Sequence, residues 1–236
     1  MTATSASELK LIAGGSLAGL FRELGPLFED ASGHTLSIHF DSTPNIISRI
    51  NSGTPFDAAV VPIDVFKDGG AKGQLSHPIE VARVGYGVIV RAGAAKPDLS
   101  TPDAFKKSLL AASSVASVPA SAAGAYVTKV YERLGIADDM KAKTKVEALP
   151  TAIAPTVARG EAELGVFLTN VFNAPGIELA GPFPADLQQE LVFATAIAKN
   201  SNRDAKVAVA AKALLDFLKT PPAVAAVKAA GMTPTP

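Results

Sequence analysis

The feature that most constrains this chain is a unit that recurs in its first sixty residues: an apolar strand, a turn of small residues, then a helix. Leu9–Ala13 is a short apolar run that ends in two glycines, which is typical of a buried strand entering a tight turn. Apolar residues then recur at helical spacing from Leu17 to Phe28. Ser16 is a candidate N-cap, and we expect Pro26 to end or bend the helix. This alternation predicts an α/β protein with a mainly parallel sheet covered on both faces.

The same pattern continues along the chain. Further strands are expected at residues 36–40, 57–61, 84–90, 114–118, 164–168 and 191–198. Further helices are expected at about residues 43–53, from 101, through 126–134, and at 152–159, 204–219 and 221–230. The sequence has no internal repeat of solenoid period. It also has no linker rich enough in Pro, Gly or Ser to separate two sequential domains. If there are two lobes, the chain therefore crosses between them more than once, near residues 81–85 and 190–195.

Composition excludes several classes of protein. The chain has 236 residues, with 22 basic against 22 acidic ones, so its net charge gives no attraction for nucleic acid. Cysteine is absent, which excludes a disulfide framework and a thiolate site. The first seven residues lack the basic start and apolar run of a signal peptide. The protein is therefore expected to be cytoplasmic, or periplasmic if a signal peptide has been removed.

Three turns combine small residues, hydroxyls and a helix start. They are Gly14-Gly15-Ser16, Asp41-Ser42-Thr43-Pro44 and Ser121-Ala122-Ala123-Gly124. Helix N-termini expose unpaired amides and carry a partial positive charge, so they bind anions without a basic side chain. Each turn taken alone is also consistent with simple capping. Three turns in the same topological position predict an anion cradle.

The chain resembles the molybdate-binding proteins, which are type II periplasmic binding proteins. The motifs that carry the resemblance are Gly14-Gly15-Ser16-Leu17, Phe40-Asp41-Ser42-Thr43, Gly53-Thr54-Pro55-Phe56-Asp57, Arg159-Gly160-Glu161-Ala162-Glu163-Leu164-Gly165 and Ala230-Gly231-Met232. The resemblance implies two lobes, each a mixed, mainly parallel sheet flanked by helices, with the ligand cleft between them. The lobes are expected at residues 1–83 plus 195–236, and at 84–194. It also implies a monomer that passes a small anion to the membrane component of an ABC transporter.

Carried over by position, the resemblance implies a set of ligand-binding residues. These are Gly15 and Ser16, one of Ser42 or Thr43, the hydroxyl of Ser121 or the amide of Ala122, the amides near Thr151, and Thr169. Leu168 stands where the molybdate binders have a ligand-contacting tyrosine, which argues against molybdate itself. Arg83 could pair with a carboxylate, or could be a surface arginine at a strand start. An oxyanion and a small carboxylate both remain open as ligands.

A second function is open on the same scaffold. The chain resembles a branch of the family that includes aconitate isomerase-like proteins, which implies cofactor-independent isomerisation of a small unsaturated polycarboxylate. That reaction needs a general base, for which His39, Lys129 and Tyr126 are candidates. The histidines lack the i, i+4 spacing of a helical metal pair, so no metal and no cofactor are expected. Gly14 to Ala18 lacks the last glycine of a hydrolase elbow.

Overall fold

The computed structural model describes residues 6–199 and 205–235. The chain divides into two compact units. Unit 1 is Met1–Arg83 with Val192–Pro236, and unit 2 is Val84–Leu191. The boundaries expected from the sequence were after residues 83 and 194. The expected helix start at Asp204 and the first five residues lie outside the described part of the chain.

In unit 1, four strands lie side by side in the order β2-β1-β3-β9. The strands are β1 (Glu8–Gly14), β2 (Thr35–Asp41), β3 (Ala58–Pro62) and β9 (Glu190–Ile197), of which β9 begins two residues before the unit boundary. The first three are parallel to one another, whereas β9 runs antiparallel to β3. The sheet is therefore mixed and mainly parallel, as predicted.

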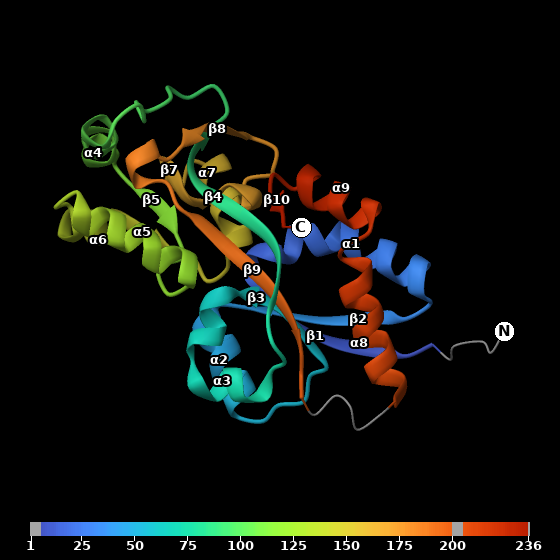
Figure 1. The fold of residues 1–236 in the computed structure, drawn as a ribbon. Helices are drawn as coiled ribbons and strands as arrows, with labels where there is room; N and C mark the ends of the chain where they lie inside the picture. Colours follow the sequence, from blue (N-terminus) through green and yellow to red (C-terminus); the bar gives the residue numbers. More distant parts are fainter. Residues whose placement is uncertain (1–5, 200–204, 236) are drawn as a thin grey trace. The chain divides into compact units, whose positions relative to one another are not determined.

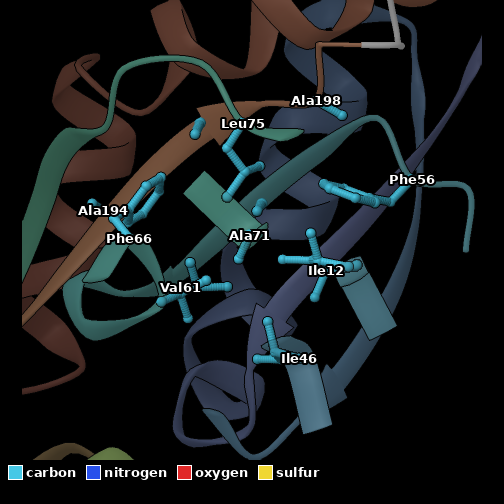
Figure 2. Close-up of a cluster of buried hydrophobic side chains, with 13 residues drawn as sticks. Ile12, Ile46, Phe56, Val61, Phe66, Ala71, Leu75, Ala194 and Ala198 are labelled. Carbon is cyan, nitrogen blue, oxygen red and sulfur yellow. The ribbon is translucent and has the colours of Figure 1, made fainter. Parts of the chain in front are cut away.

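The helices of unit 1 cover both faces of this sheet (Figure 1). On one face lie α2 (Thr43–Asn51), the 3-10 helix η2 (Ile63–Lys67) and α3 (Gly69–Gln74). They enclose an apolar cluster that includes Ile12 of β1 and Ala194 of β9 (Figure 2). On the other face lie α1 (Ala18–Ser32), α8 (Ala205–Phe217) and α9 (Pro221–Ala229). Strand side chains alternate between the two faces, so β1, β3 and β9 bury side chains on both sides, whereas every residue of the edge strand β2 is at least partly exposed.

The start and course of α1 differ from the expectation. A 3-10 turn, η1 (Gly15–Leu17), precedes the helix, so Ser16 lies inside that turn and Leu17 is the N-cap. Pro26 neither ends nor interrupts α1, which continues to Ser32. Phe28, fully buried, stacks edge-on against Phe217 of α8 with ring centroids 5.6 Å apart. Packing beyond the proline thus offsets the backbone hydrogen bond that the proline removes.

Unit 2 contains the sheet β8-β4-β7-β5-β6. Its strands are β4 (Ile79–Arg91), β5 (Val115–Ser117), β6 (Thr144–Val146), β7 (Leu164–Leu168) and β8 (Ile177–Pro182), of which β4 begins in unit 1. β6, β5 and β7 are parallel, and β4 is antiparallel to β7 and β8. Four helices belong to this unit: α4 (Pro102–Ala111), α5 (Ala122–Arg133), α6 (Ala137–Lys143) and α7 (Ile153–Ala158).

Two further short elements bear on the candidate site and on the C-terminal segment. The 3-10 helix η3 (Pro150–Ala152) leads into α7, and β10 (Thr233–Pro234) pairs antiparallel with β4. Within the described residues, no helix combines the length and apolar character needed to cross a bilayer.

Candidate functional site

The carboxyl edge of the unit 1 sheet brings two of the predicted turns together. β1 and β2 pair in parallel over seven residues, and the last pair is Gly14 with Asp41. The residues that follow each strand therefore leave the sheet at the same level. Gly15 and Ser16 follow β1, whereas Ser42 and Thr43 follow β2 and begin α2. The parallel register thus places four of the five predicted unit 1 residues at one edge, and Arg83 is the exception.

The hydroxyl of Ser42 does not cap its own helix. The N-caps of α3, α4 and α5 each accept a hydrogen bond from an amide of the first turn, whereas Ser42 makes no such bond although it is the N-cap of α2. Thr43, the next residue, is 8% exposed, and its side chain makes no hydrogen bond with any described residue. Capping alone does not account for these two hydroxyls, so both remain candidates for binding.

Asp41 adds a negative charge to this edge. Its Oδ1 atom accepts hydrogen bonds from the Ser42 amide at 2.7 Å and from Nδ2 of Asn45 at 2.8 Å. Its Oδ2 atom lies 3.4 Å from Nε2 of His39. Pro44 has no amide hydrogen, so the α2 start offers fewer free amides than most helix starts. Asp41 was expected only as part of the turn, and the Asn four residues later was the sequence signal for this side-chain hydrogen bond.

In unit 2, three predicted residues follow three neighbouring parallel strands. Ser121 comes after β5, Thr151 after β6 and Thr169 after β7, and β5 pairs with both of the others. Carboxyl ends of parallel strands meet at one edge of a sheet, where α/β proteins bind ligands. The unit 2 residues thus share an edge, as those of unit 1 do.

The hydroxyl of Ser121 is committed to capping. Its Oγ accepts from the Gly124 amide at 3.0 Å and donates to the Val118 carbonyl at 2.8 Å. A side chain on Gly124 would place its Cβ 1.8 Å from that same carbonyl oxygen, so only glycine allows α5 to begin this close to the preceding strand. The donors left at this helix start are backbone amides, with Ala122 at the first helical position.

The other candidate residues occupy varied surroundings. Thr151 is exposed in η3, and the hydroxyl of Thr169 donates to the Gly85 carbonyl at 3.4 Å. Leu168 is fully buried at the end of β7, so it offers no polar contact. Arg83 of unit 1 donates to Glu80 at 2.6 Å, and its side chain is 42% exposed.

The candidate general bases also differ in their contacts. The Tyr126 hydroxyl donates to the Leu187 carbonyl at 2.8 Å, and Lys129 is exposed on α5. His39 lies on β2 with 43% of its side chain exposed and has a carboxylate partner in Asp41. Among the described residues, no group of three or more histidine, aspartate or glutamate side chains could hold a metal ion.

Comparison with known proteins identifies the family. The family of bacterial extracellular solute-binding proteins matches residues 9–233. The chain belongs to this family. An aconitate isomerase of Pseudomonas sp is 30% identical over 246 aligned positions, which cover all of this chain and 91% of that protein. The molybdate-binding protein ModA of Azotobacter vinelandii is 26% identical over 243 positions, covering 97% of this chain and 91% of the relative.

Solved structures show the same fold. The periplasmic molybdate-binding protein of Azotobacter vinelandii superimposes with a TM-score of 0.74 at 21% identity, covering 97% of this chain and 99% of that one. This solute-binding protein thus has the two-lobed type II periplasmic-binding fold that the motifs predicted. The resemblance to molybdate binders and to aconitate isomerase is confirmed as well.

The contrast between Ser42 and Ser121 leads to the first prediction. Ser121→Ala removes a cap and should lower the free energy of unfolding by about 1 kcal/mol. Ser42→Ala removes a hydroxyl that caps nothing and should change it by less than about 0.5 kcal/mol. Urea denaturation of the two variants and the parent checks this. Equal losses in the two variants would show that Ser42 also serves as a cap in solution.

Proposed function

We propose that this solute-binding protein captures a small anion, an oxyanion or a small carboxylate, on hydroxyls and backbone amides at the carboxyl edges of its sheets. The observation that carries the proposal is the β1–β2 register, which brings Ser16, Ser42 and Thr43 to one edge. Helix dipoles and amides favour an anion there without a basic side chain. Family membership and the molybdate-binding relatives support the same ligand class.

Unit 2 would supply a second set of donors: the amides at the α5 start, Thr151 and Thr169. Leu168 lacks the phenol of the molybdate binders, which favours another oxyanion or a carboxylate. Arg83 would contribute only by exchanging Glu80 for the ligand. The further steps of the proposal are a monomeric protein working outside the cytoplasm and delivery to the membrane component of an ABC transporter.

Binding of the ligand should stabilise the folded protein by mass action. At 100 times its dissociation constant, a bound anion adds about 2.7 kcal/mol, which raises the melting temperature by about 5–10 °C for a chain of this size. Thermal unfolding with molybdate, tungstate, sulfate, phosphate, citrate and cis-aconitate identifies the class. Ser16→Ala should weaken binding of the active anion about tenfold and leave the fold intact.

A matched control is Ser48→Ala, which alters an exposed serine on α2. It should bind as tightly as the parent. If no anion shifts the melting temperature of the parent, the proposed function is wrong. If an anion binds but Ser16→Ala retains full affinity, the assignment of Ser16 is wrong and the function stands.

Asp41 should set which anions are accepted. Its carboxylate accepts a hydrogen bond from the Ser42 amide and adds a negative charge beside the proposed donors. Two like charges about 4 Å apart near a protein surface repel by about 1–4 kcal/mol, so fully deprotonated dianions should be disfavoured. Asp41→Asn removes the charge and keeps an acceptor oxygen. It should tighten sulfate or molybdate binding about tenfold, as measured by isothermal titration calorimetry.

The control for this change is Asp103→Asn, which removes an exposed charge from the first turn of α4 in unit 2. It should leave dianion affinity unchanged. Unchanged or weaker dianion binding by the Asp41 variant would show that the Asp41 carboxylate does not oppose the ligand.

A second function, isomerisation of a small unsaturated polycarboxylate, is favoured by two observations. The first is the 30% identity with the aconitate isomerase of Pseudomonas sp. The second is the His39–Asp41 pair, in which a carboxylate can orient an imidazole as a general base. Proton transfer by such a base contributes about 10²–10⁴-fold to a rate.

This alternative predicts turnover of cis-aconitate. Incubation with the protein should change the ultraviolet spectrum as the trans isomer forms, and His39→Gln should lower the rate at least about 100-fold. His77→Gln, which changes a histidine in the loop before β4, should retain the parent rate. A spectrum that stays constant with the parent protein excludes this activity and leaves the receptor proposal in place.

A further inference from the structure

Two threonine hydroxyls of unit 1 are shielded from solvent without a hydrogen-bond partner among the described residues. They are Oγ1 of Thr195 in β9 and Oγ1 of Thr235 beyond β10. Thr195 is 1% exposed, and its strand neighbours Ala194 and Ala196 belong to the apolar cluster on the opposite face. Leaving a buried hydroxyl unpaired costs about 1–3 kcal/mol, a cost that valine, of the same shape, would avoid. We therefore expect the Thr195 hydroxyl to have a polar partner in the folded protein.

The two threonines line the same small cavity. The wall also includes Ile79, Glu80 and Val81 of β4, Leu215 of α8, and Leu218 and Lys219 just after that helix. Within this cavity, the space that the centre of a water molecule can reach is about 10 Å³. That is about the room that one water molecule needs, and it is too small for an oxyanion or a carboxylate.

We propose that Thr195 and Thr235 bind one ordered water molecule in this cavity. Each hydroxyl can donate one hydrogen bond and accept others, so a water molecule can bridge them whichever way the hydroxyls turn. Two hydroxyl oxygens, even with the two carboxylate oxygens of Glu80, which pairs with Arg83, fall short of the six or more oxygen ligands that calcium takes. Water is therefore the ligand that both the donor set and the volume fit.

The bridge would tie three segments of unit 1 together. The Thr235 amide already donates to the Val81 carbonyl at 3.2 Å, and Thr233 pairs with Arg83, so the C-terminal residues are held on β4. The water adds a link from this segment to β9. β4 and β9 are the two strands that contain the unit boundaries, after Arg83 and before Val192. The C-terminal segment thereby anchors both strands at the point where they belong to unit 1.

The test combines a crystal structure with a double-mutant cycle. Electron density should show one water oxygen within about 2.7–3.2 Å of both hydroxyl oxygens. Thr195→Val and Thr235→Val should each lower the melting temperature by about 2–4 °C. The double variant should lose little more than the larger single effect, because both changes remove the same bridge. Thr195→Ser, which keeps the hydroxyl, should retain the water and most of the stability.

The control pairs Thr195→Val with Thr128→Val in unit 2. The Thr128 hydroxyl has its own partner, the Gly124 carbonyl at 3.1 Å, so the two losses should add. Additive losses at Thr195 and Thr235 would overturn the proposal. A crystal structure in which the two hydroxyls bond directly, or in which Lys219 reaches them in place of water, would overturn it as well. Anion binding plays no part in this test, so its result is independent of the proposed function.

Discussion

The parallel register of β1 and β2 is the constraint on which the candidate site depends. Ile12 of β1 packs in the apolar cluster beneath α2 and α3, and Phe40 of β2 lies against Phe21 of α1, so a shift by one residue would turn these side chains to the wrong face. Packing on both faces therefore fixes which residues leave the sheet together. Gly14 and Asp41 end their strands as a pair, and the hydroxyl-bearing turns follow at once. The position of the proposed anion donors is thus a consequence of how the core of unit 1 is packed.

Charge at this edge would then decide which anion the proposed site accepts. Neutral donors and helix dipoles attract anions of many shapes, so they give affinity with little selectivity. Asp41 would add selectivity. Its carboxylate accepts a hydrogen bond from the Ser42 amide and would repel a ligand with two full negative charges. A ligand that brings a proton to donate, such as a protonated oxyanion or a hydroxyl-bearing carboxylate, meets an acceptor instead. At the proposed site the same residue would therefore oppose one class of anion and favour another.

The sequence predicted most long elements, because buried strands and amphipathic helices have distinct periods. It missed β6, β8, α3 and α6, which are short and have no clear periodicity. The expectation that Pro26 could end α1 was wrong, since the packing of Phe28 against Phe217 cannot be read from local sequence. The hydroxyls of Ser42 and Ser121 looked equivalent, yet only Ser121 caps its helix. Capping depends on the side-chain rotamer and on nearby acceptors such as the Val118 carbonyl, which only the folded chain defines.

A receptor and an enzyme on this scaffold would need nearly the same binding groups. Both must hold an anion on neutral donors, and only the enzyme needs a base near a carbon-bound proton. The candidate base that has a carboxylate partner is His39, which lies two residues before the β2 end and contacts Asp41. Asp41 would then both orient the imidazole and limit the charge of the ligand. Selectivity for a partly protonated ligand and the capacity to move a proton would depend on one carboxylate, so a change in either property should alter the other.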